Sequence, residues 1–368
     1  MVNSPEQLDL RTKVGQLFFI GIAGPELDAS TRELIEDFRP GGICLFARNI
    51  REAKQTRELL DGIREMSQLV PFLSLDQEGG LVDRLRRILT PMPAANKIRT
   101  VEEARRLASL IAESTRLLGF NTDFAPVVDV IDAAREKDNN GLYSRAFGSN
   151  AEGATELAGA FLDKLQSEGI LGCIKHFPGL GAAAVDSHEE LPSVEIDDNE
   201  LSNTDLLPYR KLTATHDPAF VMVAHAAFPN SKNQISDLDG RMTPSSLNGK
   251  FVTELLRDEF NYEGISITDD LEMGAILKNY GIGKACVKAV NAGEDMLAIC
   301  AGRDNIIEGR DAVIGAVERG EIAMERVDEA VARIERGRQR LSPPLEFNAE
   351  RLAELSDEIA EFNQHLNR

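Results

Sequence analysis

The chain has 368 residues, with 61 acidic and 41 basic side chains and a formal net charge of −20. This acidic balance disfavours binding to the phosphate backbone of a nucleic acid or to an anionic membrane surface. The hydrophobic content of 42% predicts a globular protein with a sizeable core, organised as one large domain or two ordinary ones.

The N-terminal segment and the cysteines indicate in which cellular compartment the protein is expected. The chain starts without the basic and apolar regions of a secretory signal, and no apolar run approaches the roughly 20 residues of a membrane helix. The four cysteines lie far apart in apolar stretches without metal-binding spacing, which indicates buried thiols in a reducing compartment. We therefore expect a cytoplasmic protein with no metal, no cofactor, no nucleic-acid partner and no membrane partner. The oligomeric state stays open.

Short, almost continuously apolar runs recur along the chain, as expected for parallel strands covered on both faces. They are residues 17–22, 42–46, 72–75, 124–130, 171–174, 220–224, 265–267 and 296–299. Helix signals separate them. Thr100 and Glu103 form a capping box, Thr243-Pro244 predicts a helix start, and residues 153–168 and 304–318 carry apolar residues at helical spacing.

Eight β-then-α units in roughly 300 residues predict a (β/α)8 TIM-type barrel, with a doubly wound open sheet as the alternative. Residues 322–340 and 349–367 are expected to form two closing helices, the second of them polar and loosely held. With no linker composition near the middle, we expect one domain over residues 1–345 and a helical extension over residues 346–368.

One loop carries the densest chemistry. Lys175 and His176 end the fifth apolar run, and a segment rich in Gly and Ala then leads to Asp186 and His188. Histidine titrates near neutral pH, and a carboxylate two residues away can orient it. The loop therefore favours a mobile acid–base group, although a polar surface loop explains the same residues equally well.

Polar residues follow most of the other runs as well, and in a barrel these positions converge at one end. They include Asp76, Glu78, Arg84, Asp129, Arg145, His225, Asp269, Asp270 and Glu272. Nucleotide, dinucleotide, zinc-protease and serine-hydrolase motifs are absent from the sequence. Charged donors and acceptors around carboxylates suit a polyhydroxylated ligand such as a sugar. Since the chain has no tryptophan, Tyr143, Phe147 or Phe177 is expected to face the sugar ring.

Five motifs in order resemble glycoside hydrolase family 3, and in particular its single-domain β-N-acetylglucosaminidases. They are Asp76-Gln-Glu-Gly-Gly, Ser144-Arg-Ala-Phe-Gly, Lys175-His-Phe-Pro-Gly, Asp186-Ser-His-Glu-Glu-Leu-Pro and Thr268-Asp-Asp-Leu-Glu-Met. The resemblance extends over about residues 10–340, which is nearly the whole chain.

The resemblance implies a retaining mechanism in which Asp269 is the nucleophile that forms a glycosyl-enzyme. It also implies that His188 is the acid/base and that Asp186 orients it. The sugar-binding positions map onto Asp76, Arg84, Arg145, Lys175 and His176. For His225 a structural role and a binding role are equally open, whereas Asp270 and Glu272 are expected to be structural.

The sequence departs from the family pattern at three places near the expected site. Leu180 replaces a common histidine, Ala182 and Ala183 replace a frequent polar pair, and Leu81 replaces the arginine usual after Glu-Gly-Gly. These departures leave the chemistry of Asp269, His188 and Asp186 in place. They affect the expected loop closure and the fit of the leaving group, and a shifted aglycone preference would also explain them.

The resulting hypothesis is an exo-acting β-N-acetylglucosaminidase, or β-N-acetylhexosaminidase, that recycles cell-wall muropeptide fragments. A β-N-acetylglucosaminide phosphorylase with the same residues stays open, because a histidine does not repel an anionic acceptor. A catalytically impaired sugar-binding barrel and a β-glucosidase or β-xylosidase are further alternatives. So is a metal-dependent barrel enzyme with Asp76, Glu78, Asp269 and Asp270 as ligands.

Overall fold

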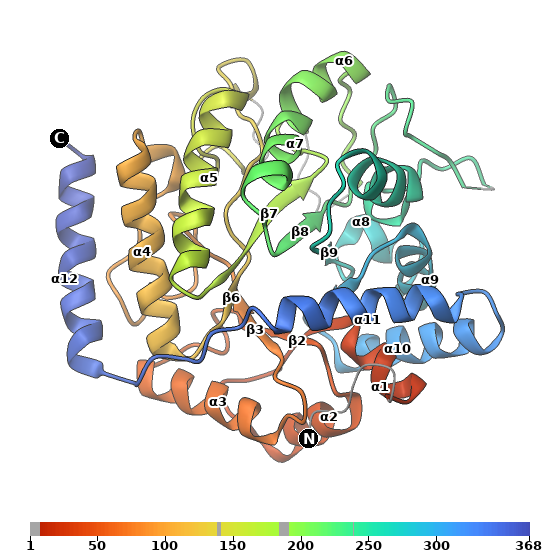
Figure 1. The fold of residues 1–368 in the computed structure, drawn as a ribbon, viewed down its shortest axis with the longest axis horizontal. Helices are drawn as coiled ribbons and strands as arrows, with labels where there is room; N and C mark the ends of the chain where they lie inside the picture. Colours follow the sequence, from red (N-terminus) through yellow and green to blue (C-terminus); the bar gives the residue numbers. More distant parts are fainter. Residues whose placement is uncertain (1–7, 138–140, 184–190, 238) are drawn as a thin grey trace.

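The computed structural model describes residues 8–137, 141–183, 191–237 and 239–368. Eight parallel strands close into a barrel in the order β1-β10-β9-β8-β7-β6-β3-β2, with helices around it, which confirms the predicted (β/α)8 TIM-type fold (Figure 1). The strands are β1 (Phe18–Gly21), β2 (Gly42–Cys44), β3 (Phe72–Leu75), β6 (Thr122–Asp123), β7 (Leu171–Phe177), β8 (Phe220–Val223), β9 (Ile265–Asp270) and β10 (Met296–Ile299).

A helix follows each barrel strand, and α1 (Leu10–Gln16) precedes the first one. These helices are α2 (Ala29–Phe38), α3 (Ala53–Met66), α4 (Val101–Leu118), α5 (Ala151–Ser167), α7 (Leu206–Thr215), the π-helix η6 (Lys250–Glu259), α9 (Ile282–Ala292) and α10 (Arg303–Glu318). Shorter elements lie in the loops: the hairpin β4 (Gln77–Gly79) and β5 (Val82–Asp83), η2 (Ala95–Lys97), η3 (Arg135–Lys137), α6 (Asp198–Glu200), η4 (Leu201–Asp205), η5 (Ser245–Leu247) and α8 (Gly274–Leu277).

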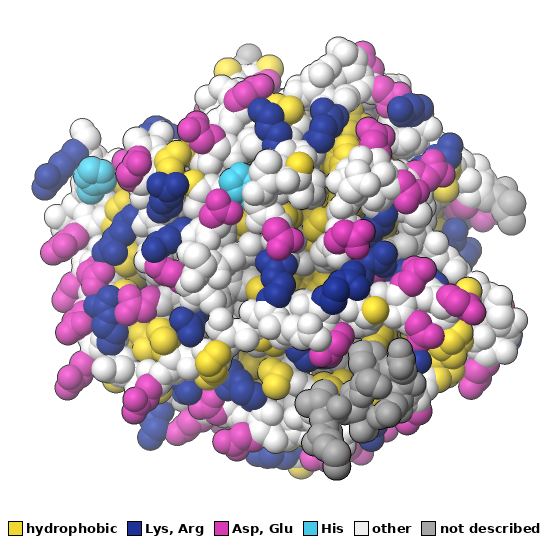
Figure 2. Space-filling view, viewed as in Figure 1, with side chains coloured by type: hydrophobic (Ala, Val, Ile, Leu, Met, Phe, Trp, Pro, Cys, Tyr) yellow, Lys and Arg dark blue, Asp and Glu magenta, His cyan; other side chains and the backbone are white. Residues whose placement is uncertain are grey.

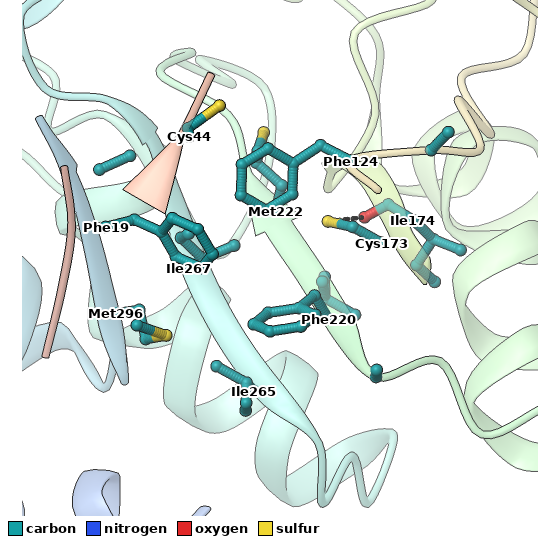
Figure 3. Packing of buried hydrophobic residues seen from close by; sticks show 14 of the residues in the cluster. Phe19, Cys44, Phe124, Cys173, Ile174, Phe220, Met222, Ile265, Ile267 and Met296 are labelled. Atoms are coloured by element: carbon teal, nitrogen blue, oxygen red, sulfur yellow. Dashed lines mark hydrogen bonds between the residues drawn. The ribbon is translucent and has the colours of Figure 1, made fainter. Parts of the chain in front are cut away.

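Aromatic side chains pack with isoleucine, methionine and cysteine side chains in the buried core (Figure 3). The rings of Phe19 and Phe124 lie 5.0 Å apart and those of Phe72 and Phe220 also 5.0 Å apart, both pairs edge-on. All four side chains are almost completely buried. Large rings from β1, β3 and β8 and from the residue after β6 thus exclude water from the barrel core.

The fourth strand was predicted too late in the sequence, at residues 124–130. The barrel strand is β6, Thr122–Asp123, and the following segment is buried but irregular. Its amides still bond to the neighbouring strands, since Phe124 donates to Leu75 O and Val128 donates to Lys175 O. Pro126 has no amide hydrogen, however, so a continuous ladder of backbone hydrogen bonds cannot form across this segment.

The helix predicted from Thr243-Pro244 is also placed incorrectly. Residues 245–247 form the separate 3-10 turn η5, and η6 begins only at Lys250. Buried Asn248 lies between the two with extended backbone, and its side-chain oxygen accepts the Lys250 amide at 3.0 Å. A local side-chain bond of this kind competes with helix continuation.

Helices α11 (Met324–Arg338) and α12 (Ala349–Leu366) close the fold, and α12 stands beside α4 in Figure 1. The prediction that this last helix is loosely held is wrong. Its apolar face is buried, and Arg351 binds Glu113 of α4 at 2.6 Å while Arg106 of α4 binds Glu358 at 2.6 Å. The capping box of Thr100 and Glu103 at the start of α4 is confirmed.

Charged side chains of both signs are interspersed over the face in Figure 2, with hydrophobic side chains scattered among them. Within the described ranges, none of the helices combines the length and the apolar character that crossing a membrane requires.

Phe220→Ala should destabilise the protein by about 3–5 kcal/mol, because it opens a cavity among three aromatic rings in the barrel core. Urea unfolding followed by circular dichroism measures the change. Val70→Ala removes an apolar side chain that is already 39% exposed and should change stability little. Equal effects of the two substitutions would contradict the packing described for the core.

Candidate active site

A buried lysine organises the floor of the site at the carboxyl end of β7. Lys175 Nζ lies 2.8 Å from Asp76 Oδ1 and 2.7 Å from Glu78 Oε1, and its side chain is only 2% exposed. Asp76 directly follows β3 and Glu78 lies in β4, so the ammonium group joins strand β7 to the segment that follows β3. Burial alone would lower the pKa of Lys175, but the two carboxylates raise it above its ordinary value, so the lysine stays charged.

Two arginines complete the charge cluster. Arg145 donates to Glu78 through Nε and Nη2, at 2.7 and 3.0 Å, and Arg84 donates to Asp76 Oδ2 at 3.1 Å. Burial would raise the pKa of Glu78, but Arg145 and Lys175 outweigh it and lower that pKa to about 2. The pKa of Asp76 is likewise lowered against burial by Lys175 and Arg84. Both carboxylates are therefore ionised at neutral pH.

His176 is held by a second carboxylate. Its Nδ1 lies 2.7 Å from Asp129 Oδ2, and the other oxygen of Asp129 accepts the Leu180 amide at 2.7 Å. Because the carboxylate is an acceptor, we assign the hydrogen to Nδ1, so that Nε2 points to Arg145 Nη2 at 3.5 Å. Asp129 thus fixes both the histidine ring and the start of the following loop.

Asp269 and Asp270 end strand β9. Asp269 Oδ1 accepts the Asp270 amide at 2.8 Å. Burial opposes ionisation of Asp269, but the nearby His176 side chain, this amide and the Lys175 ammonium lower its pKa below the ordinary value. Burial raises the pKa of Asp270 to about 7, and the neighbouring carboxylates of Glu272 and Asp269 add to the rise. Two adjacent aspartates therefore differ in charge near neutral pH.

His225 lies beneath this pair and is fully buried. Its Nε2 is 3.1 Å from the Asp270 carbonyl oxygen and its Nδ1 is 2.7 Å from Ser246 Oγ. Burial lowers the pKa of His225, so a neutral ring donates to the carbonyl and accepts from the serine. These contacts support the structural role that the sequence left open for His225.

The contacts of Glu272 support the structural role expected for it, and its side chain also lines the active-site cavity. Its carboxylate accepts the amides of Ala301 and Gly302 and the side-chain amide of Asn305, which caps the N-terminus of α10.

A cavity of about 500 Å³ opens at the carboxyl ends of the strands. Six of the predicted site residues line it together: Asp76, Arg84, Arg145, Lys175, His176 and Asp269. Asp186 and His188 lie outside the described residues, so the acid/base dyad stays a prediction. Ala183, the last described residue before that segment, lines the cavity.

The sequence prediction did not include Glu78 and Asp129 among the site residues, although both are polar residues that follow predicted strands. Glu78 binds two of the predicted cations, and Asp129 orients His176. The sequence does contain one indication for Glu78. It lies two residues after Asp76, and side chains two residues apart in an extended segment point to the same face.

The expectation for the aromatic platform is wrong. Phe177 packs against Tyr209 and Phe147 against Phe161, both in the core, and Tyr143 is exposed without lining the cavity. Phe46 and Phe124 are the aromatic side chains among the described residues that line it. The guanidinium groups of Arg48 and Arg84 stack over the Phe46 ring, with their Cζ atoms 4.7 and 5.5 Å from the ring centroid.

The described part of the chain contains no group of three or more His, Cys, Asp or Glu side chains arranged to hold a metal ion. Asp76 and Glu78, two of the ligands in the metal-dependent alternative, are instead bound to lysine and arginine. Carboxylates that are already paired with cations are poor metal ligands, so these contacts argue against a metal-dependent barrel enzyme.

The family model described as the glycosyl hydrolase family 3 N terminal domain matches residues 9–336. Among curated proteins, beta-hexosaminidase of Pseudomonas aeruginosa strain LESB58 is 33% identical over 291 residues, which cover 77% of this chain and 82% of that protein. Beta-hexosaminidase A of Pseudoalteromonas piscicida is 33% identical over 292 residues, which cover 74% of this chain but only 47% of the relative.

Solved structures agree with this match. A glycoside hydrolase family 3 beta-N-acetylglucosaminidase from Paenibacillus sp. str. FPU-7 superposes with a TM-score of 0.86 at 32% identity, covering 96% of this chain and 69% of that one. A glycosyl hydrolase family 3 member from Mycobacterium smegmatis superposes with a TM-score of 0.81 at 30% identity, covering 93% of this chain and 100% of that one. The predicted family and enzyme class are confirmed.

Glu78→Gln should destabilise the protein by about 3 kcal/mol at pH 7, because it leaves Lys175 and Arg145 buried with one carboxylate fewer. The lowered pKa of Glu78 means that its charge stabilises the fold above the ordinary value of 4.5 and that this contribution is lost as the pH falls towards about 2. The difference in unfolding free energy between wild type and variant should therefore shrink over that interval.

Urea unfolding at several pH values measures this difference. Glu361→Gln, at an exposed position of α12, is the matched control and should be neutral throughout. A penalty for Glu78→Gln that is the same at pH 3 and pH 7 would contradict the electrostatic role of Glu78.

Proposed function

This chain belongs to glycosyl hydrolase family 3, and we propose that it is a retaining exo-β-N-acetylglucosaminidase that releases terminal N-acetylglucosamine from β-glycosides. The observation that carries the proposal is the shared cavity. Asp269, a carboxylate with a lowered pKa, lines the same 500 Å³ space as Asp76, Arg84 and Lys175. The N-acetyl preference is supported by the relatives named beta-hexosaminidase and by the Paenibacillus beta-N-acetylglucosaminidase.

The charge cluster suits a sugar because every member can exchange hydrogen bonds with hydroxyl groups. Asp76 presents a carboxylate that accepts from hydroxyls, while Lys175 and Arg84 donate to them. The ion pairs hold these groups in place before the substrate arrives. A preorganised set of this kind rejects ligands that lack the matching hydroxyls, because buried polar groups would be left unpaired.

In the first chemical step, a carboxylate oxygen of Asp269 attacks the anomeric carbon from the opposite side to the leaving group. The bond from that carbon to the glycosidic oxygen breaks, and the leaving oxygen takes a proton from His188. Because Oδ1 of Asp269 accepts the Asp270 amide, we assign the attack to Oδ2. The product of this step is a glycosyl-enzyme and a free aglycone.

In the second step, His188 takes a proton from a water molecule while the water oxygen attacks the anomeric carbon and Asp269 leaves. Two inversions give net retention. The roles of His188 and of its orienting partner Asp186 rest on the sequence resemblance. Since histidine titrates near neutrality, this acid/base needs no large pKa shift.

The setting of the reaction is part of the proposal. The four cysteines are free and buried, which supports a reducing compartment such as the cytoplasm. The resemblance alone supports cell-wall muropeptide fragments as the natural substrates.

A phosphorylase is a second candidate, favoured by one feature of the cluster. Lys175, Arg84 and Arg145 supply three positive charges against the two carboxylates of Asp76 and Glu78. With the Asp269 carboxylate that lines the same cavity the formal charges balance, and the three cations are the groups that would hold a phosphate ion acting as acceptor in place of water.

An aryl β-N-acetylglucosaminide should be turned over and the matching aryl β-glucoside should not, or only much more slowly. Asp269→Ala should lower kcat by at least about 1,000-fold, because it removes the attacking oxygen. Release of the aryl group followed by absorbance measures both effects. Asp304→Ala, at an exposed aspartate of α10, is the control and should keep normal activity. Near-normal turnover by Asp269→Ala would rule out the nucleophile assignment.

In phosphate buffer, the hydrolase should still release free N-acetylglucosamine. Chromatography of the products with a sugar 1-phosphate standard measures the partition. N-acetylglucosamine 1-phosphate as the main product would instead establish the phosphorylase.

A further inference from the structure

The C-terminal helix α12 contacts the segment that follows the hairpin β4-β5. Ser356 Oγ accepts the Thr90 amide at 3.0 Å, and Asn363 Nδ2 donates to the Pro91 carbonyl oxygen at 3.0 Å. The chain between β5 and η2 is irregular here, so these two backbone groups take their partners from side chains of α12. We call residues 90–92 the tether.

The third residue of the tether bonds to the hairpin instead. The Met92 amide donates to Asp83 Oδ2 at 2.8 Å, and the Met92 carbonyl oxygen accepts the Gly80 amide at 3.0 Å. The approach is close, because Gly79 has a φ angle of 89° and a Cβ on it would lie 2.2 Å from the Pro93 carbonyl oxygen. Three consecutive residues thus connect α12 on one side to the hairpin on the other.

Inside the hairpin, hydrogen bonds connect Asp83 to the charged floor of the site. Asp83 Oδ1 accepts from Gln77 Nε2 at 2.8 Å, and Gln77 Oε1 accepts the Arg84 amide at 2.9 Å. Gln77 and Asp83 are almost completely buried, so water cannot readily replace these bonds. Arg84 in turn donates to Asp76, and both side chains line the cavity. A displacement of the tether would therefore disturb Asp76 and Arg84 together.

Helix α12 is held firmly enough to act as a support. Its apolar face is buried and two ion pairs join it to α4. Ser356 and Asn363 are seven residues apart, which places them two turns apart on one face of the helix. The family model matches the chain only up to residue 336, so these contacts come from an element beyond the matched part.

We propose that Ser356 and Asn363 are positioning residues of the active site: by fixing the tether, they hold Asp76 and Arg84 where a bound sugar contacts them. The inference rests on the proposed function and extends it to a helix outside the barrel. Neither Ser356 nor Asn363 lines the cavity, so an effect of either on sugar binding has to act through the tether.

The double variant Ser356→Ala/Asn363→Asp tests this assignment. Alanine favours the helix, and aspartate keeps the shape of asparagine but cannot donate to the Pro91 carbonyl oxygen, so α12 should persist while both bonds to the tether are lost. The KM for an aryl β-N-acetylglucosaminide should rise about fivefold, the effect of about one lost hydrogen bond, while kcat should change less than about twofold. Steady-state kinetics measures both.

Two further variants serve as controls. Gln364→Glu makes the same amide-to-carboxylate change at an exposed position of α12 and should leave KM unchanged. Ser356→Thr keeps a hydroxyl acceptor and should resemble the wild type. If α12 served stability alone, the double variant would lower the urea midpoint and the active fraction, and hence the apparent kcat, with KM unchanged. That result would overturn the positioning role.

Hydrogen exchange followed by mass spectrometry tests the tether without any substrate. Peptides covering residues 76–92 should exchange about tenfold faster in the double variant, whereas peptides covering β9 should keep the wild-type rate. Equal exchange of residues 76–92 in the two proteins would overturn the proposal even if the enzyme is active.

Calorimetry separates a failure of the tether from a failure of the reaction. If the wild type releases nothing from the aryl β-N-acetylglucosaminide, the binding of free N-acetylglucosamine decides. Binding about fivefold weaker in the double variant would reject the reaction and keep the positioning role. Equal binding by the two proteins, or no binding by either, would reject the positioning role.

Discussion

The site depends on one buried ammonium group. Lys175 lies at the end of β7 with its side chain 2% exposed, and the carboxylates of Asp76 and Glu78 keep it charged there. Burial alone would raise the pKa of both carboxylates, and the lysine and the two arginines lower these pKa values instead. Removing either carboxylate leaves buried cations with fewer partners. The floor of the cavity is therefore a single electrostatic unit, and the sugar-facing geometry follows from it.

The barrel makes this unit possible, because parallel strands bring residues from distant parts of the sequence to the same end. The aromatic layer of Phe19, Phe72, Phe124 and Phe220 keeps water out from below. Ion pairs that face a dry core on one side and an open cavity on the other are stronger than surface pairs. The same fold places Asp269 on β9 in the cavity lined by this cluster, where its lowered pKa suits a nucleophile.

Much of this arrangement could be predicted from the sequence. Apolar runs and capping signals were sufficient for the barrel, and the strand-end rule brought Asp76, Lys175 and Asp269 together. The fourth strand was misplaced because hydrophobicity alone does not register the missing amide of Pro126. The aromatic residues facing the cavity could not be predicted, because apolar composition does not distinguish a core ring such as Phe177 from a lining ring such as Phe46. Glu78 was missed as a site residue because its partners are defined only by tertiary contact.

The central claim is that Asp269 becomes covalently bonded to the sugar. The most direct test is to incubate the enzyme with 5-fluoro-N-acetyl-β-glucosaminyl fluoride, whose second fluorine slows both steps while the fluoride leaving group allows the first. Mass spectrometry of the intact protein and of its peptides then locates any adduct. The account predicts one sugar per chain, attached to Asp269. A sugar on Asp270 or Glu78, or turnover with no covalent intermediate, would contradict it.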